Sequence, residues 1–531
     1  MSALTPARDQ RRWLALPPVC YAVLVTLFVI VRYGLRWGDS DTGQILEATR
    51  NVATQGTISP SGVAYPHGYA YQSIIVAVSQ VTGVSVARVD LAVLPFLCAV
   101  LALIAFIAFR LLTGSALLGS IAAILLFIQP EFIFEVERGS HEKTTNGYVL
   151  LMVFLITATF ARSVSTSTVI GYIISFYIIA WGLITTNSFF GSSFFVSLAL
   201  ALIGGAIALG LSFRPGGQRT TINRLIYTVI SGTALVYIFV NYVYSPARNN
   251  YGTLHSLIDR VSALFLSFDV QSNPYVSIGS ATGAAWVAPW VYPLLTSFDF
   301  LITFAGLLAW CWLAYRFWRG GIRSEGRNLL LLWLFAAAFA IEVAVSAVVD
   351  FSGFLGSNLQ IRIFPLFVLF AIPLFVLAGA QLAQRFNAPL RLLSGIAAGV
   401  LITIFAITGI LKAANDPLVS NKWVFFTRDE QRALTWTDRS LNNQQVWAGF
   451  DERLRVMQTV EGLVDPAKQN RYVAGSAGSG GATRYLVDSN VTQRRGQRLK
   501  LPVPDMTRDD RIYDNGGTRI YHVVPSTPYQ P

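Results

Sequence analysis

The chain passes from an apolar run, residues 14–35, directly into the polar sequence Arg36-Trp37-Gly38-Asp39-Ser40-Asp41-Thr42-Gly43-Gln44. An apolar run of about 20 residues is long enough to cross ~30 Å of hydrocarbon as a helix. Asp39 and Asp41 therefore stand where the chain should leave a bilayer. Two carboxylates this close repel each other unless a cation, or a substrate carrying one, lies between them. The sequence thus predicts a membrane helix that opens into a functional loop.

The composition of the whole chain is that of a polytopic membrane protein. Of its 531 residues, 53% are hydrophobic and only 13% are charged, and the mean hydropathy is +0.52. A soluble domain of this length would carry about a quarter charged residues. Because no small-x-small cleavage site follows the first apolar run, we expect that run to be a membrane helix and not a signal peptide.

Apolar runs of about 20 residues recur as far as Lys412, and we place about eleven membrane helices on them. The predicted ranges are 14–35, 91–112, 115–134, 145–162, 168–186, 190–211, 223–244, 290–315, 328–349, 362–383 and 391–412. The fold class predicted from this pattern is mainly α, a transmembrane helical bundle over residues 1–412.

The arginines set the orientation of this bundle. They gather in alternate loops, all on the side of the N-terminus, which the positive-inside rule makes cytoplasmic. This placement also accounts for the net charge of +12 and argues against a nucleic-acid partner. A short apolar segment, Tyr71–Val84, could also be a membrane helix. If it crossed the membrane, every later arginine-rich loop would lie on the external side. We therefore interpret it as an interfacial or re-entrant helix inside a long external loop, 36–90.

Residues 413–531 have a different composition, rich in Asp, Arg, Asn and Gly. Short runs such as Arg484–Val487 and Arg519–Val524 are typical of strands. We predict a small external α/β domain here, on the same side of a cell membrane as the loops 36–90, 135–144, 245–289 and 350–361. The cysteines lie inside apolar runs and predict neither a disulfide framework nor a zinc site.

A second group of acids lies on the predicted external side, in Glu135-Val136-Glu137-Arg138-Gly139-Ser140-His141-Glu142-Lys143-Thr144-Thr145-Asn146. Hard divalent cations prefer carboxylate oxygens and commonly leave coordination positions open for phosphate. External loops also carry acids simply because they are polar. The combination with Asp39 and Asp41, and with the nearby Pro66-His67-Gly68, favours a site over this general explanation.

Two charged residues lie in or beside later helices. Arg362 stands at the external mouth of a predicted helix, where it could extend to the lipid headgroups or bind a lipid-linked phosphate in a bidentate way. Since an external arginine is unexpected under the positive-inside rule, we favour the phosphate. Glu342 lies in the middle of a helix and needs a partner or a cavity. It could relay protons in a transporter or form a structural pair.

These residues resemble the catalytic subunit of oligosaccharyltransferase, within the GT-C class of membrane glycosyltransferases. In that family a first-loop aspartate precedes an Ala-Thr-Arg helix and a glycine, and here Asp41 precedes Ala48-Thr49-Arg50 and Gly56. The family's second external loop follows an Ile-x-Pro segment, which is Ile128-Gln129-Pro130 here. The resemblance puts Glu142 on the family's metal-binding aspartate.

The acceptor-side motifs of the family are missing. Ser280, in Ser277-Ile278-Gly279-Ser280, stands where the family has a glutamate that positions the metal and the acceptor amide. The Trp-Trp-Asp-Tyr-Gly motif, which reads the acceptor sequon, is replaced by Val446-Trp447-Ala448-Gly449-Phe450-Asp451. The resemblance therefore covers the membrane half of the chain better than the C-terminal domain.

The resemblance implies an inverting glycosyltransferase with a polyprenyl-phosphate or polyprenyl-pyrophosphate sugar donor and a glycan, glycolipid or protein acceptor. Mn²⁺ or Mg²⁺ would be held by Asp41 and Glu142 with Asp39 nearby, and Asp41 would also activate the acceptor. Arg362, the counterpart of a donor-binding arginine of the family, would clamp the phosphate. Further candidates for substrate binding are Lys143, His141 and His67. The alternatives are a transporter or flippase of lipid-linked sugars and a non-catalytic paralogue.

Overall fold

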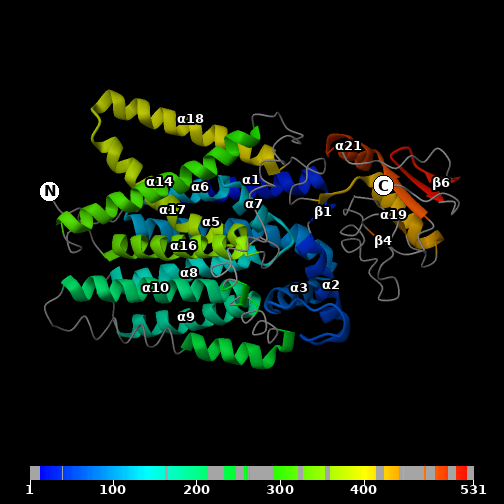
Figure 1. Ribbon diagram of the computed structural model, residues 1–531, viewed down its shortest axis with the longest axis horizontal. Helices are drawn as coiled ribbons and strands as arrows, with labels where there is room; N and C mark the ends of the chain where they lie inside the picture. The colour runs from blue at the N-terminus through cyan, green and yellow to red at the C-terminus, as the bar shows by residue number, and fades with distance from the viewer. Residues whose placement is uncertain are drawn as a thin grey trace.

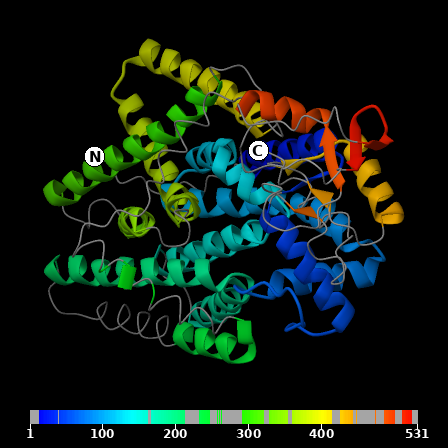
Figure 2. The same ribbon diagram turned by 45° about the vertical axis from the view of Figure 1, so that its right-hand side comes forward.

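The computed structural model describes residues 12–38, 40–161, 166–212, 232–246, 291–320, 327–352, 359–413, 424–441, 485–499 and 510–522, with the short pieces 446–447 and 472–473 and isolated positions between 256 and 262. A bundle of long helices occupies one end of the molecule (Figure 1). The C-terminal strands and α19 lie at the other end, where α1 runs out of the bundle (Figures 1 and 2).

The bundle is built from the long apolar runs of the sequence. After a short 3-10 turn, Arg12–Ala15, its helices are α1 (Leu16–Tyr33), α5 (Leu97–Thr113), α6 (Ala116–Ile128), α8 (Glu142–Ala161), α9 (Thr166–Thr186), α10 (Ser188–Ser212), α14 (Val291–Gly320), α16 (Arg327–Phe351), α17 (Leu359–Gln384) and α18 (Ala388–Ala413). Each predicted range overlaps a helix, and 223–244 overlaps the shorter Gly232–Val243. Within the described residues, eight helices are long and apolar enough to span a membrane, so the predicted number of eleven is not confirmed.

The predicted span 115–134 is wrong as a single straight helix. It divides into α6 and α7 (Pro130–Glu137), whose axes differ by 76°. Gln129 between them has an extended backbone, and its side-chain oxygen accepts a hydrogen bond from the Phe132 N–H. Proline at the first position of α7 favours a new helix start, because it removes the N–H that would have continued α6. The bend directs α7 toward the loop of Asp41.

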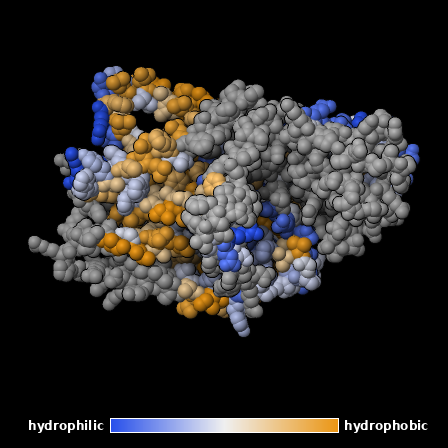
Figure 3. Space-filling view, in the orientation of Figure 1, coloured by the Kyte–Doolittle hydropathy of each residue, from blue (hydrophilic) through white to orange (hydrophobic). Residues whose placement is uncertain are grey.

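The bundle has a buried centre and an apolar outer surface. In α17, 72% of the span is buried, whereas in α18 only 11% is. Orange, hydrophobic side chains gather over the bundle end of the molecule (Figure 3). On α18 the exposed side chains include Leu392, Ile396 and Val400. An apolar surface of this extent is stable in contact with lipid, which makes the chain an integral membrane protein.

The segment between α1 and α5 folds into short helices that pack on the end of the bundle. They are α2 (Ser40–Gln55), α3 (Ala70–Thr82) and α4 (Val86–Arg88), followed by a π turn (Val89–Val93) and a 3-10 turn (Leu94–Phe96) that lead into α5. The predicted helix at 71–84 is therefore present as α3. The segment is tied to the start of α10, where the Ser188 N–H donates to the His67 carbonyl at 2.6 Å.

The C-terminal part is a small α/β structure, as predicted. Its elements are β2 (Val424–Phe425), α19 (Arg428–Ser440), β3 (Val446–Trp447), β4 (Tyr472–Val473), β5 (Tyr485–Ser489), α21 (Asn490–Leu499), β6 (Asp510–Asp514) and β7 (Thr518–His522). The sheet order is β4-β3-β5-β7-β6, with β3 parallel to both neighbours and β7 antiparallel to both of its own. A capping box between Thr427 and Glu430 begins α19.

A two-stranded ribbon joins this C-terminal part to the loop of Asp41. β1 (Trp37–Gly38) pairs antiparallel with β2, with Trp37 opposite Phe425. Beneath the ribbon, buried side chains from α1, β1 and α19 share one apolar cluster that includes Tyr33, Trp37 and Leu434. The C-terminal part is thus fixed directly beside the start of α2.

Candidate functional site

An arginine joins the two carboxylates that the sequence selects. Nη1 of Arg138 lies 3.2 Å from Oδ2 of Asp41, and Nη2 of Arg138 pairs with Oε1 of Glu142. The exposed fraction of the side chain is 29% for Asp41, 9% for Arg138 and 5% for Glu142. The structure therefore brings Asp41 and Glu142 to one cation, and only Asp41 faces outward.

Local structure explains why these charges gather here. Asp41 is in the first turn of α2 and Glu142 is in the first turn of α8. The N-terminal end of a helix favours a negative charge, since its backbone N–H groups point outward. Arg138 follows the last residue of α7, and its guanidinium lies 4.8 Å from the centre of the Phe134 ring. Three helix ends thus converge with alternating charge.

Glu142 is held in its ionised form. Burial would raise the pKa of Glu142, but Arg138, His141 and a hydrogen bond from the Ser140 hydroxyl outweigh it and lower that pKa to about 2. A carboxyl group with so low a pKa is a poor proton donor or acceptor near neutral pH. Glu142 therefore serves as a fixed negative charge that orients Arg138.

Lys143 is buried, and its ammonium group is used within the protein. Nζ donates to the carbonyls of Arg138 at 2.6 Å and Ser140 at 2.7 Å and to the Tyr71 hydroxyl at 3.2 Å. An ammonium group has three N–H donors, so these contacts take all of them. Burial lowers the pKa of Lys143. The geometry favours a role in holding the turn 138–143 in place over the direct donor contact expected from the sequence.

The two histidines meet at one tyrosine ring. The Tyr65 ring lies 5.5 Å from the His67 ring and 5.2 Å from the His141 ring. His141 is buried, and its Nε2 pairs with the Asn187 side-chain amide at the start of α10. Nδ1 of His67 is buried without a hydrogen-bond partner among the described residues. Because the His67 side chain is partly exposed and His141 is buried, His67 is the better placed of the two to bind a substrate group.

We expect the protein to lose stability between pH 7 and pH 5. Burial lowers the pKa of both His67 and His141 to about 4, against about 6.5 in an unfolded chain. Below pH 6.5 the unfolded chain therefore binds protons that the folded chain excludes, at about 2 kcal/mol per histidine at pH 5. Thermal unfolding in detergent at several pH values measures this slope. His67→Gln should reduce it, and an unchanged slope in that variant would contradict the assignment.

Gly139 allows Arg138 and Glu142 to approach α2. A Cβ added at Gly139 would collide with Oδ2 of Asp90 and would lie 2.7 Å from Cγ2 of Thr42. No side chain fits in that space without a movement of the turn or of α2.

Replacement of this glycine should be destabilising. Gly139→Ala is expected to cost about 1–3 kcal/mol, the usual effect of overpacking a buried position, and to lower the unfolding temperature in detergent. The matched control is Gly171→Ala in α9, where an added Cβ meets nothing within 4 Å and alanine favours the helix. Equal unfolding temperatures for the two variants would contradict the close packing at Gly139.

The other predicted residues fall in different places. Glu135 and Glu137 do not join the pair of Asp41 and Glu142. The Asn146 amide donates to Glu135 at 3.4 Å, and the Thr26 hydroxyl donates to Glu137 at 2.7 Å. Asp39, the loop 263–289 with Ser280, and the segment 448–451 lie outside the described residues.

Arg362 lies near this group of residues. It is exposed in the first turn of α17. Burial of His67 is the main cause of its lowered pKa, and the positive charge of Arg362 lowers that pKa further. The start of α17 is fixed by Asp350, which accepts the N–H groups of Leu359 and Gln360 at 2.8 Å. A charge on a fixed helix start beside His67 is available to an anionic ligand.

A metal site of three or more His, Cys, Asp or Glu side chains is absent from the part of the chain that the structure describes. The two carboxylates that a divalent cation would need both contact the guanidinium of Arg138. As arranged, these residues do not fit a divalent cation, since Arg138 takes the place between them.

Four neighbours of this site did not emerge from the sequence. Arg138, Tyr71 and Asn187 contact predicted site residues, and Asp90 accepts a hydrogen bond from the Tyr71 hydroxyl at 2.6 Å. Asp90 lies in the π turn before α5, a type of turn that is often found at functional sites. An acid directly before an apolar run was the one available signal for Asp90.

The architecture is similar to that of the oligosaccharyltransferase from Archaeoglobus fulgidus. Its apo form is 12% identical to this chain over 91% of this chain and 70% of the other, with a TM-score of 0.57. The same enzyme, AglB, in complex with an inhibitory peptide and a dolichol-phosphate is 10% identical over 90% and 70%, with a TM-score of 0.53. Its complex with Zn and sulfate is 11% identical over 88% and 68%, with a TM-score of 0.52. No protein-family model and no curated protein matches the sequence.

These likenesses agree with the helical bundle and the C-terminal α/β structure described above. They extend over nine-tenths of the chain. The helical membrane fold predicted from the resemblance is confirmed, and the chain is an integral membrane protein with a fold similar to that of the archaeal oligosaccharyltransferase.

Proposed function

We propose that the chain is a membrane glycosyltransferase that moves a sugar from a polyprenyl-phosphate or polyprenyl-pyrophosphate donor to an acceptor on the external face. The observation that carries this proposal is the convergence of Asp41, Arg138 and Glu142 at the end of a GT-C bundle. The dolichol-phosphate bound to the archaeal oligosaccharyltransferase supports a lipid-linked donor. Its inhibitory peptide supports an acceptor site on the same fold.

Arg362 would bind the donor phosphate. A guanidinium group matches phosphate in a bidentate geometry, and its charge stabilises the negative charge that develops on the leaving phosphate. Its position at the start of α17, beside His67, would place the phosphate next to the first external loop. His67, whose side chain is partly exposed, would bind a hydroxyl group of the substrate.

Asp41 would act as the general base. In an inverting transfer, the acceptor oxygen or nitrogen attacks the anomeric carbon while the bond from that carbon to the phosphate oxygen breaks. The electron pair of that bond leaves with the phosphate, and the acceptor proton passes to the Asp41 carboxylate. Asp41 suits this role better than Glu142 because it is partly exposed, whereas Glu142 is buried and held ionised.

The positive charge between the carboxylates is assigned to Arg138. Mn²⁺ or Mg²⁺ held by Asp41, Glu142 and Asp39 is the alternative, and it would require Arg138 to withdraw from both carboxylates. The Zn in one structure of the archaeal enzyme supports that alternative for the fold. Transfer measured after EDTA treatment separates the two. We expect activity to persist in EDTA, and a loss that Mn²⁺ restores would favour the metal.

The function itself is tested by donor cleavage. Purified protein in nanodiscs, supplied with a panel of prenyl-phosphate and prenyl-pyrophosphate sugars, is expected to release the prenyl carrier and to form a glycosylated product. A transporter would instead move such lipids across proteoliposomes without cleaving them. The residue that favoured transport, Glu342, accepts a hydrogen bond from the Ser197 hydroxyl at 2.6 Å, which is a structural pair within the bundle. No cleavage of any donor would overturn the proposal.

A further inference from the structure

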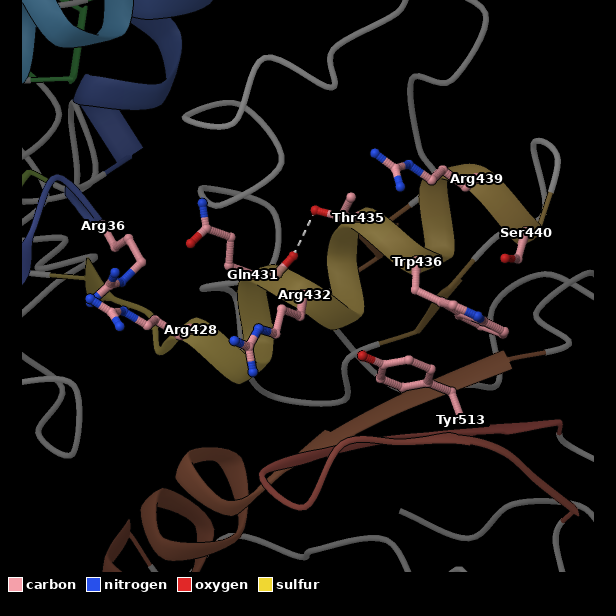
Figure 4. Close-up of a pocket in the computed structure, with 9 residues that line it drawn as sticks. All are labelled: Arg36, Arg428, Gln431, Arg432, Thr435, Trp436, Arg439, Ser440 and Tyr513. Atoms are coloured by element: carbon pink, nitrogen blue, oxygen red, sulfur yellow. Dashed lines mark hydrogen bonds between the residues drawn. The ribbon is translucent and has the colours of Figure 1, made fainter.

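A pocket of about 490 Å³ lies in the C-terminal part, apart from the residues discussed above. One face of α19 forms most of it, through residues spaced three or four positions apart, and the other walls are Arg36 and Tyr513 (Figure 4). The ribbon of β1 and β2 fixes Arg36 there, since its Nε donates to the Phe426 carbonyl at 3.3 Å. The pocket therefore lies where the C-terminal part meets the loop of Asp41.

The charge of this pocket is strongly positive. Among the residues that the structure describes, its lining holds four arginines and no acidic residue, and the arginines are Arg36, Arg428, Arg432 and Arg439. Figure 4 shows the Arg36 and Arg428 guanidinium groups together at one end and Arg439 at the other. Like charges gathered around a cavity repel each other, and an anion between them removes that cost.

The two acids in the first turn of α19 do not neutralise this charge. Asp429 lies 3.9 Å from Arg432, but both side chains are well exposed, and such pairs contribute little in water. Glu430 is buried on the other face of α19, where its carboxylate binds Thr427 and the Ser489 hydroxyl. The arginine face is thus open to an anionic ligand.

Two aromatic rings form the remaining wall. The rings of Trp436 and Tyr513 pack with their centres 4.8 Å apart at 31°, and both side chains are partly exposed. Aromatic rings offer an apolar surface to the C–H face of a sugar, while nearby polar groups fix its hydroxyls. Gln431 and Thr435 supply such polar groups between the arginines. The combination suits a sugar that carries acidic groups better than a bare inorganic anion.

We propose that this pocket binds an acidic glycan, one whose sugar units carry carboxylate or phosphate groups. The guanidinium groups of Arg428, Arg432 and Arg439 would pair with the acids, and Trp436 with Tyr513 would support a sugar ring. α19 lies at the end of the molecule away from the apolar helix surface, which favours a glycan over a lipid headgroup (Figures 1 and 3). If the proposed function is correct, on which this last step rests, the acidic glycan is the acceptor.

The test measures binding to the full chain in nanodiscs of zwitterionic lipid. The probes are tetragalacturonate and its methyl ester, which is neutral but otherwise the same size. We expect the acid to bind at least about tenfold more tightly than the ester, with a strong dependence on salt. The double variant Arg432→Gln, Arg439→Gln should weaken binding of the acid by at least about tenfold. The control is Arg494→Gln, an exposed arginine of α21 outside the pocket, which should bind like the wild type.

Three outcomes would overturn the proposal. They are equal binding of acid and ester, unchanged binding in the double variant, and tighter binding of glycerophosphoglycerol, which would identify an anionic lipid headgroup as the ligand. Binding in the Asp41→Asn variant separates this inference from the proposed function. If the acid binds but no donor is ever cleaved, the glycosyltransferase proposal fails and the glycan site remains. If donors are cleaved but the acid does not bind, the glycan-site proposal fails and the glycosyltransferase proposal remains.

Discussion

Asp41→Asn should reduce sugar transfer by about 10³-fold while leaving the protein folded. Asparagine has the same shape and can still accept a hydrogen bond from Arg138, which lies 3.2 Å from the Asp41 carboxylate. It cannot take the proton of the acceptor. The loss should therefore appear in kcat, with little change in the KM for the donor, because Arg362 is expected to bind the phosphate. The assay follows the glycosylated product formed from a prenyl-linked donor by purified protein.

The control for this prediction is Asp510→Asn. Asp510 is an exposed carboxylate at the start of β6, outside the group of Asp41, Arg138 and Glu142. It should keep the activity of the wild type. Transfer that survives in Asp41→Asn would remove the general-base assignment. If the loss of transfer in Asp41→Asn is accompanied by a large fall in its unfolding temperature, Asp41 is instead a structural residue.

The bundle could be predicted from the sequence because lipid leaves few choices. Backbone polar groups in hydrocarbon must be satisfied within the helix, so a long apolar run becomes a helix whatever its neighbours are. α16 and α18 follow their predicted ranges closely. The break after Ile128 was readable too, since Pro130 marks a helix start. It was missed because the apolar run continues through the proline to Phe134.

The contacts of the site could be predicted only in part. Asp41 was found as one of two close carboxylates where the chain leaves a bilayer, and Glu142 was selected by the resemblance to the family's second external loop. The ion pair of Arg138 with Asp41 joins residues 97 positions apart and depends on the bend at Gln129. A local pattern carries no information about such a pair. A local pattern also does not predict the contacts of Lys143, whose three hydrogen-bond partners depend on how the turn 138–143 folds.

The connection between the C-terminal part and the first loop was also beyond local patterns. β1 and β2 contain two residues each, too few for an alternating strand signal. Their pairing follows from packing, since Trp37 and Phe426 are buried in one cluster with Tyr33 of α1. The arginine pocket depends on this pairing, because Arg36 reaches α19 only through it.

Arg138→Met should be the most destabilising single change at the site. It keeps much of the apolar stem over Phe134 but removes the cation that Asp41 and Glu142 share. A buried carboxylate that loses its partner costs about 3–5 kcal/mol. Arg138 is the largest of the charges that lower the pKa of Glu142, so its removal raises that pKa from about 2. The stability lost by the variant is then largest near neutral pH and shrinks as the pH falls and Glu142 takes up a proton.

Thermal unfolding of Arg138→Met and wild type, compared at each pH in detergent, measures this difference. Comparison at the same pH cancels the contribution of His67, which both proteins share. The contribution of His141 does not cancel, because Arg138 also lowers the pKa of His141, and its loss acts in the same direction as the change at Glu142. The matched control is Arg88→Met, an exposed arginine of α4 that should leave the unfolding temperature unchanged. Removal of Arg138 also frees two carboxylates for a hard cation, so Mn²⁺ should raise the unfolding temperature of the variant and not of the wild type. Two results together would contradict the role of Arg138 and favour a metal ion between the carboxylates. Mn²⁺ would raise the unfolding temperature of the wild type, and Arg138→Met would be as stable as Arg88→Met.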